Sequence, residues 1–102
     1  MELFEAVSKN DVFKVMKLLE EGVDPNQLDI DQHYTALHHA VQNNAPDVVL
    51  LLVTAGADLN AKTEENLTVF DLARQARDQK MLHLLIRLFY MKATVHRKRY
   101  LH

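Results

Sequence analysis

Residues 35–60 read TALHHAVQNNAPDVVLLLVTAGADLN, and this segment determines the fold class. Thr35 stands where the N-cap of a helix is expected, because its hydroxyl can accept a hydrogen bond from a first-turn amide, and His38 three residues later can return one. Leu37, Ala40 and Val41 follow at three- and four-residue spacing, which is the period of a helix with one buried stripe. The segment therefore predicts a short amphipathic helix that begins directly after Thr35.

A second helix is predicted after the turn at residues 44–47 (NAPD). Pro46 suits the first turn of a helix, because the amide hydrogen that proline lacks would be unpaired there anyway. We expect this helix over residues 46–54. Gly56 follows where a residue without Cβ ends a helix in the left-handed conformation. No strand-like alternation of useful length appears, so we expect an all-α chain with extended turns.

The helix pair recurs along the chain. Residues 21–26 (EGVDPN) recur as residues 55–60 (AGADLN) at an offset of 34, and residues 35–40 (TALHHA) recur as residues 68–73 (TVFDLA) at an offset of 33. The first junction therefore holds one extra residue, which we expect within residues 26–34. Self-similarity with this period is typical of a solenoid, in which each repeat packs against its neighbours.

The composition is that of one globular domain. The chain has 102 residues, of which 48% are apolar and 25% charged, and it has no Cys. Disulfides and thiolate sites are therefore excluded, and packing must supply the stability. Val48 to Ala57, the longest apolar stretch, is far shorter than the ~20 residues of a membrane span. The N-terminus has no basic segment followed by an apolar run, so we expect no secretory signal and a cytoplasmic location.

At this point the residues resemble the ankyrin-repeat family. Residues 35–40 (TALHHA) are similar to the T-P-L-H-x-A helix start of that family, with Ala36 in place of the usual proline. Residues 49–60 are similar to its V-x-x-L-L-x-x-G-A-D-x-N segment. The first unit lacks the threonine start, and the third has Asp71 in place of the motif histidine. Terminal repeats of solenoids are commonly atypical, so we expect one central repeat between two caps.

The resemblance covers residues 2–90 and implies an ankyrin-repeat solenoid, in which antiparallel helix pairs stack and are joined by extended β-turn loops. The expected units are residues 1–29, 30–62 and 63–90, followed by a basic C-terminal tail at residues 91–102. In the turns between units this family usually places Gly at the fourth position, where this chain has His33 and Asn66. Both residue types tolerate a positive φ better than most, so the turns are expected to form.

The resemblance implies recognition of another protein, because ankyrin repeats generally bind through the tips of these turns and the surface of the inner helices. Tyr34 and Leu67 are the expected anchors, since an apolar or aromatic group on a polar rim is typical of a hot spot. Acidic residues nearby favour a partner with a basic or polar surface. We expect an adaptor subunit or an inhibitor. The matching positions are Asp31, Gln32, His33, Tyr34, Lys62, Glu64, Glu65 and Leu67 in the turns, and Gln42, Asn43 and Gln75 on the inner helices.

The end of the third unit leaves two interpretations open. Where a Gly-Ala turn is expected, residues 84–91 read LLIRLFYM, which is strongly apolar for a cap. These side chains either fold back over the last core layer or form a surface for a partner or a second copy of the chain. A second interaction surface would then comprise Phe89, Tyr90, Met91, Arg97, Lys98 and Arg99.

The alternative function is contact with nucleic acid or an acidic surface through the tail, with the repeats as a scaffold. The net charge is -2, yet residues 91–102 carry Lys and Arg and no acid. Residues 95–100 (VHRKRY) interleave basic and aromatic side chains, which can contact phosphate and stack on a base. The acidic body argues against nucleic acid, and a solvated tail is the simpler interpretation. A short basic run can also serve as a nuclear address.

The sequence lacks the patterns of an enzyme or a metal site. It has no G-x-S-x-G segment, no phosphate-binding loop and 2 Gly in total. Asp29, Asp31 and His33, with His38 or His39, supply metal-ligating atom types, but their spacing matches no metal site, and we interpret them as a polar turn. We therefore expect a non-enzyme without cofactor or metal.

One modification site is a candidate. Leu52 and Asn60 resemble the ankyrin asparagine-hydroxylation pattern, in which a leucine precedes the target asparagine by eight positions. The simpler interpretation is that Asn60 is the residue with which this family stabilises its turns.

Overall fold

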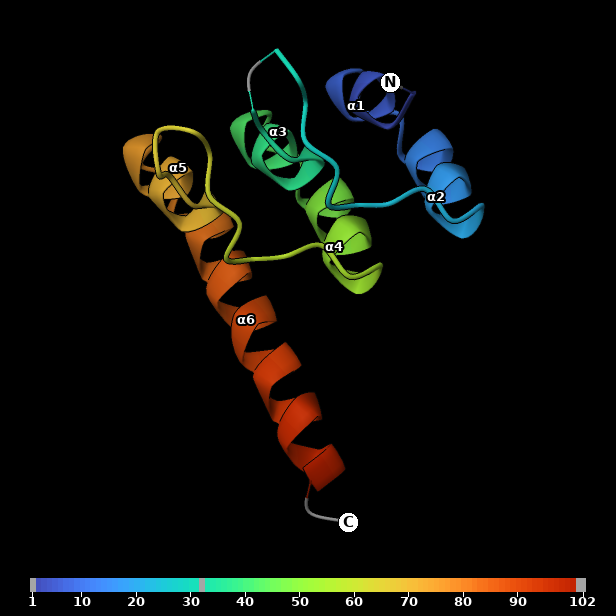
Figure 1. Cartoon of the computed structure of the whole chain (residues 1–102). Coiled ribbons are helices and arrows are strands. Elements are labelled where there is room, and N and C mark those ends of the chain that lie inside the picture. Colours follow the sequence, from blue (N-terminus) through green and yellow to red (C-terminus); the bar gives the residue numbers. More distant parts are fainter. Residues whose placement is uncertain (1, 32, 101–102) are drawn as a thin grey trace.

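The computed structural model describes residues 2–31 and 33–100, with side chains described as far as Lys92. Six α-helices lie in these residues and form three consecutive pairs, which we call units 1, 2 and 3 (Figure 1). The pairs are α1 (Glu2–Ser8) with α2 (Val12–Glu20), α3 (Ala36–Gln42) with α4 (Pro46–Thr54), and α5 (Val69–Gln75) with α6 (Gln79–Tyr100).

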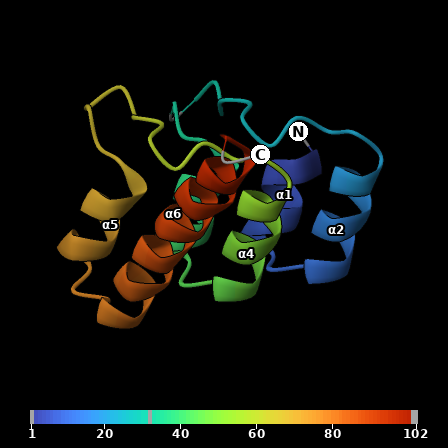
Figure 2. The ribbon, with the colours of Figure 1, turned by 90° about the horizontal axis from the view of Figure 1, so that it is seen from below.

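The units stack side by side, so that α1, α3 and α5 form one row and α2, α4 and α6 form another (Figures 1 and 2). Within the described residues no strand forms, and an isolated antiparallel bridge joins Leu28 to Thr35. The predicted all-α class is confirmed. Helices α3 and α5 begin directly after the long turns between units, which brings those turns and the first turns of both helices to the same edge of the molecule.

The helix cap predicted for unit 2 is confirmed, and unit 3 has an equivalent cap. Thr35 Oγ1 accepts a hydrogen bond from the His38 amide at 3.3 Å, and His38 Nδ1 accepts one from the Thr35 amide at 3.4 Å. In unit 3, Thr68 Oγ1 accepts from the Asp71 amide at 3.2 Å, and Asp71 Oδ2 accepts from the Thr68 amide at 3.0 Å. Hydrogen bonds from Thr68 hold the pKa of the Asp71 carboxyl below its ordinary value.

Residues in the left-handed conformation end the helices. Asparagine and glycine adopt a positive φ with less strain than other residues, because asparagine bonds locally and glycine has no Cβ. The helix α4 consequently ends at Thr54, as predicted. These residues are Asn10, Asn44 and Arg77 within the units, with φ of 54°, 53° and 55°, and Gly22 and Gly56 after α2 and α4, with φ of 94° and 106°.

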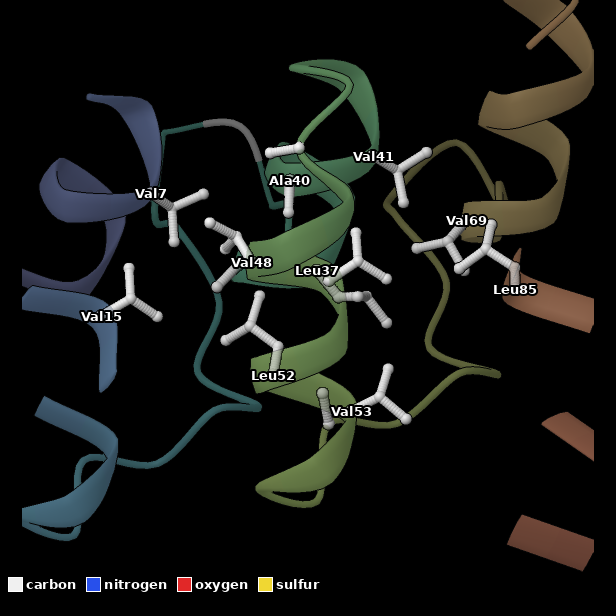
Figure 3. Packing of buried hydrophobic residues seen from close by; sticks show 14 of the residues in the cluster. Val7, Val15, Leu37, Ala40, Val41, Val48, Leu52, Val53, Val69 and Leu85 are labelled. Carbon is white, nitrogen blue, oxygen red and sulfur yellow. The ribbon is translucent and has the colours of Figure 1, made fainter. Parts of the chain in front are cut away.

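The core runs through all three units. Leu37 and Leu52 are fully buried in unit 2. Figure 3 shows Val48 on the side of unit 2 that faces α1 and α2, and Val41 and Val53 on the side that faces α5 and α6. The central unit therefore has two apolar flanks, each covered by a neighbour, which is how a solenoid without a large single core gains its stability.

Asn26 ties unit 1 to unit 2. Its Nδ2 atom donates a hydrogen bond to the Gly56 carbonyl at 3.1 Å, and its Oδ1 atom accepts one from the Asp58 amide at 2.7 Å. The Asp58 carboxylate in turn accepts from the amide of Asn60 at 2.8 Å. The side chain of Asn60, the residue equivalent to Asn26, is exposed and makes no hydrogen bond within the described part of the chain.

The helix α6 continues where α4 stops. The residue equivalent to Gly56 is Phe89, and the helix runs through it to Tyr100, across the boundary expected at residue 90. Lys92 Nζ donates a hydrogen bond to the Ala57 carbonyl at 3.3 Å, which holds α6 against the turn after α4. No described helix is both long enough and apolar enough to cross a membrane.

Continuation of α6 determines where its apolar end lies. Tyr90 and Met91 are 65% and 61% exposed, and Phe89 is 40% exposed, on a helix that extends beyond the body of the repeats. The ring of Phe89 packs edge-on against Phe70 of α5, with ring centroids 6.2 Å apart. The end of the array therefore leaves apolar surface uncovered.

Candidate functional site

The first long turn, at residues 29–34, forms a loop that we call finger 1. The Asp29 amide donates to the Tyr34 carbonyl at 2.7 Å, and the His33 amide donates to the Asp29 carbonyl, also at 2.7 Å. His33 has a φ of 56°. Gln32, one of the predicted binding residues, lies outside the described residues. The expected left-handed conformation at His33 is confirmed.

The second long turn, at residues 63–67, forms finger 2 and is closed in a similar way. The Thr63 amide donates to the Leu67 carbonyl at 2.9 Å, and the Asn66 amide donates to the Thr63 carbonyl at 2.8 Å. Asn66 has a φ of 68°, as expected. Asp29 and His33 occupy the positions of Thr63 and Asn66, so the extra residue of the first junction lies between them, within the predicted segment.

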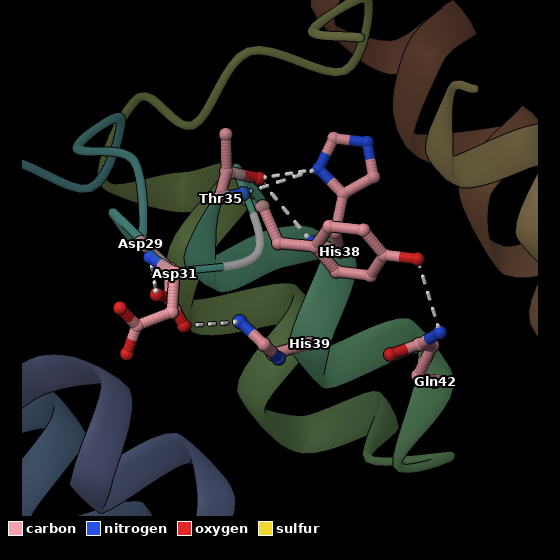
Figure 4. Close-up of polar contacts among 7 residues, drawn as sticks. Asp29, Asp31, Thr35, His38, His39 and Gln42 are labelled. Carbon is pink, nitrogen blue, oxygen red and sulfur yellow. Dashed lines mark hydrogen bonds and ion pairs between the residues drawn. The ribbon is translucent and has the colours of Figure 1, made fainter. Parts of the chain in front are cut away.

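His38 connects finger 2 to helix α3. Its Nδ1 atom lies 2.7 Å from Thr35 Oγ1, and its Nε2 atom lies 3.1 Å from the Leu67 carbonyl oxygen (Figure 4). Because a carbonyl oxygen can only accept, Nε2 carries the hydrogen and Nδ1 acts as the acceptor at the cap. Burial lowers the pKa of His38, since the imidazolium would lose its hydration there. The neutral ring is therefore the form that fits.

Tyr34 is held from behind by the body of unit 2. Its ring centroid lies 5.5 Å from that of His38 and 5.3 Å from that of His39. Its hydroxyl accepts a hydrogen bond from Gln42 Nε2 at 3.3 Å (Figure 4). Tyr34 and Leu67, the two predicted anchors, are both half-buried against the core, so each presents only part of its side chain to a partner.

The carboxylate of Asp29 stabilises finger 1. Asp29 Oδ1 accepts from the Asp31 amide at 2.9 Å, and Asp29 Oδ2 lies 3.3 Å from His39 Nε2 (Figure 4). His33 Nε2 lies 3.5 Å from Glu64 Oε2, so it pairs with finger 2 instead. In the described residues no three His, Cys, Asp or Glu side chains gather as metal ligands would.

The sequence interpretation missed Ile30, the most exposed large apolar residue of the described chain. Its side chain is 86% exposed at finger 1, and Leu28 at the base of the loop is exposed as well. Exposed single apolar residues are common, but this one stands on a loop that two main-chain hydrogen bonds close. The available clue was an isoleucine between two aspartates in the segment that holds the extra residue.

The remaining predicted binding residues are solvent-exposed, as a contact surface requires. The His33–Glu64 pair and the Gln42–Tyr34 hydrogen bond bring some of them together. Asn60 is exposed too, and its hydroxylation stays a prediction. The side chains of Arg97, Lys98 and Arg99 lie outside the described residues. The exposed residues are Asp31, His33, Gln42, Asn43, Lys62, Glu64, Glu65 and Gln75.

Known proteins share the repeats of this chain. A family model described as "Ankyrin repeats (many copies)" matches residues 18–73. The chain is 41% identical over 71 residues to the 2-5A-dependent ribonuclease of Mus musculus. This alignment covers 70% of this chain and 10% of that protein. The chain is also 40% identical over 79 residues to ankyrin repeat and SOCS box protein 6 of Mus musculus. This alignment covers 76% of this chain and 18% of that protein.

The chain spans less than a fifth of these two curated relatives. Among solved structures it is similar to the ankyrin repeat domain of Bcl-3, described as a unique member of the IkappaB protein family. The TM-score is 0.81 at 31% identity, over 84% of this chain and 38% of that chain. The family model covers more than half of the chain, and the stacked helix pairs have the same arrangement as a solved ankyrin domain, so this chain belongs to the ankyrin-repeat family.

Proposed function

We propose that this chain is a non-catalytic binding module that acts as an adaptor or an inhibitor by occupying a surface of one partner protein. Ankyrin repeats are generally protein-interaction modules. The proposed contact surface, which we call the finger face, consists of the exposed residues of fingers 1 and 2 together with Gln42, Asn43, Lys62 and Gln75. Because hydrogen bonds fix both fingers before binding, little ordering entropy is lost when a partner docks.

The exposure of Ile30 is the observation that carries this proposal. A side chain that is 86% exposed on a fixed loop can enter a pocket of a partner and become buried there. Burying an aliphatic side chain of this size contributes about 1.5–3 kcal/mol. Tyr34 and Leu67 add the parts of their side chains that remain exposed and support the loops from below. Ile30 is therefore the principal anchor.

The charge of the finger face defines the partner further. Asp31, Glu64 and Glu65 are exposed on fingers 1 and 2, with Lys62 as the nearby cation in the sequence. A partner surface with an apolar pocket bordered by Lys or Arg would be complementary. Such charges chiefly raise the association rate and select the partner, while the anchor slows dissociation.

The test is affinity capture from native lysate followed by mass spectrometry, with the full chain as bait. The variant Ile30→Ser removes the anchor, and Phe13→Ser is the matched control, because Phe13 is an equally exposed apolar residue (80%) on the distant helix α2. The wild type and Phe13→Ser should enrich the same protein. With Ile30→Ser the captured amount of that protein should fall by at least about tenfold. Equal capture by the two variants would move the binding site away from finger 1.

A further inference from the structure

The last unit presents a second apolar surface, on the side away from unit 2. It consists of Phe70 of α5 and Leu82, Ile86 and Phe89 of α6, and we call it the open flank. Leu82, Ile86 and Phe89 are spaced by four and three residues, so they form one stripe along α6. This stripe is separate from Met81, Leu85 and Leu88, which are buried inside the array.

The repeat shows what kind of surface the open flank is. With the offset of 33, Phe70, Leu82 and Ile86 are equivalent to Leu37, Val49 and Val53 of unit 2. Those three residues are buried, and Figure 3 shows Val53 facing α5 and α6. The open flank is therefore the surface against which a following helix pair would stack.

Nothing in the described chain covers this surface. Ile86 is 37% exposed and Phe89 is 40% exposed, whereas Val53, the counterpart of Ile86 in the covered flank of unit 2, is 4% exposed. Phe89 occupies the place of Gly56, and α6 continues through it instead of turning into another repeat. Phe70 and Phe89 pack edge to face at an interplanar angle of 83°, which joins the stripe on α6 to α5.

The outer flank of unit 1 carries a charge at one stacking position. Val48 of unit 2 faces unit 1 in Figure 3, and its equivalent in unit 1 is Lys14, which is exposed. A lysine in place of a stacking valine is what a cap needs, because the terminal flank faces water. The open flank has one such substitution too, since Arg74 stands where unit 2 has Val41. The open flank is thus an apolar stacking surface with a basic border.

Charge around the open flank selects its occupant. Arg74 pairs with Asp71, their atoms Nη1 and Oδ1 being 3.2 Å apart. His83 and Arg87 line the exposed stripe of α6 beside Ile86, and within the described residues Arg87 makes no ion pair. Two copies that met flank to flank would bring these basic borders together, which disfavours a dimer through this surface. A partner with carboxylates at the border would be attracted.

We infer that the open flank is a docking site for an amphipathic helix of another protein, with an apolar stripe bordered by Asp and Glu. The helix lies in the place of the next repeat and extends the interface by which units 1, 2 and 3 already stack. Its apolar stripe covers Ile86 and Phe89, and its carboxylates face Arg74 and Arg87. This site is separate from the finger face, so both can be occupied at once.

The probe is a synthetic amphipathic peptide of about 20 residues, long enough to be helical, with a leucine stripe bordered by Glu. A second peptide has the same stripe bordered by Lys. Both are titrated into the isotope-labelled full chain and followed by NMR chemical shifts. The Glu peptide should shift the resonances of Phe70, Leu82 and Ile86 and leave those of finger 1 unchanged. The Lys peptide should bind at least about tenfold more weakly.

The double variant Ile86→Gln with Phe89→Gln should lose binding of the Glu peptide by at least about tenfold. Its circular dichroism spectrum and melting temperature establish that it is folded, and Phe13→Ser and Ile30→Ser are controls that should bind the Glu peptide normally. The inference is overturned if the two peptides bind equally, if the shifts map elsewhere, or if neither binds at millimolar concentration. A dimer through the open flank, detected by sedimentation and lost in the double variant, would make the occupant a second copy instead.

Discussion

His38 Nε2 donates a hydrogen bond to the main-chain carbonyl of Leu67, 3.1 Å away, and thereby fixes finger 2 to the first turn of helix α3. The same ring accepts hydrogen bonds at the N-cap of α3 through its other nitrogen. One neutral imidazole thus joins a helix start in unit 2 to a loop of unit 3. Protonation would remove the acceptor at Nδ1 and place a charge in a buried site.

The first prediction concerns pH. Because burial lowers the pKa of His38 below its ordinary value near 6.5, acid protonates this ring in the unfolded chain before it does so in the folded protein. The free energy of unfolding should therefore be constant above about pH 6.5 and fall as the pH decreases towards the folded-state pKa. Urea titrations between pH 7.5 and pH 5 measure this slope.

The variant His38→Gln isolates the contribution of that ring. It should be less stable at pH 7.5 by about 1–3 kcal/mol, since buried hydrogen-bonding groups lose a partner. Its stability should also depend less on pH than that of the wild type, because the buried ring is gone. An unchanged slope in the variant would assign the pH dependence to another group.

The second prediction compares two equivalent asparagines. The Asn26 side chain makes two hydrogen bonds to unit 2, at Gly56 and Asp58, whereas the side chain of Asn60 makes none within the described residues. Asn26→Ala should therefore lower the free energy of unfolding by about 1–3 kcal/mol, and Asn60→Ala should change it by less than about 0.5 kcal/mol. Chemical denaturation of both variants tests this, and equal losses would contradict it.

The third prediction concerns the core of unit 2. Leu52 is fully buried in α4, and Leu50 on the same helix is 48% exposed. Leu52→Ala should cost about 3–5 kcal/mol, because it leaves a cavity between units, and Leu50→Ala should cost less than about 1 kcal/mol. The midpoints of urea unfolding measure both. Similar midpoints would show that unit 2 does not carry the core.

The fourth prediction concerns the acidic residues of finger 2. Glu64→Gln with Glu65→Gln should slow association with the captured partner by about three- to tenfold at low ionic strength, with little change in dissociation. Stopped-flow or surface-based kinetics at two salt concentrations measure this effect. Glu20→Gln with Glu21→Gln, which removes the same charge from exposed positions at the end of α2, is the control. Equal slowing by the control would show that the association rate depends on net charge and not on the position of Glu64 and Glu65.

Much of the fold was predictable because its determinants are local. The pairs Thr35 with His38 and Thr68 with Asp71 lie three residues apart, so the capping boxes could be derived from spacing alone. Pro46 and Gly56 marked the limits of α4 for similar reasons. The end of α6 was harder to predict. The absence of a glycine indicates that the helix does not end in a turn, but it does not show how far the helix continues.

The candidate site was less predictable, because exposure is set by contacts distant in sequence. Tyr34 is of a residue type common in anchors. It is nevertheless half-buried, because it contacts the rings of His38 and His39 and the amide of Gln42. Ile30 is apolar, and only the backbone of finger 1 places it in solvent. Residue type predicted the surface correctly where no tertiary contact intervened, as at Glu65.

Fingers 1 and 2 differ in length by one residue between their closing hydrogen bonds. Both are nevertheless followed by a helix that begins with a capping box. The closing bonds join Asp29 to Tyr34 and Thr63 to Leu67. They keep the start of the following helix in place whatever the length of the loop between them. Since the entropy of closing a loop rises only slowly with its length, longer or foreign segments can be grafted at these two places. The protein is in this respect a compact host for exchangeable recognition loops.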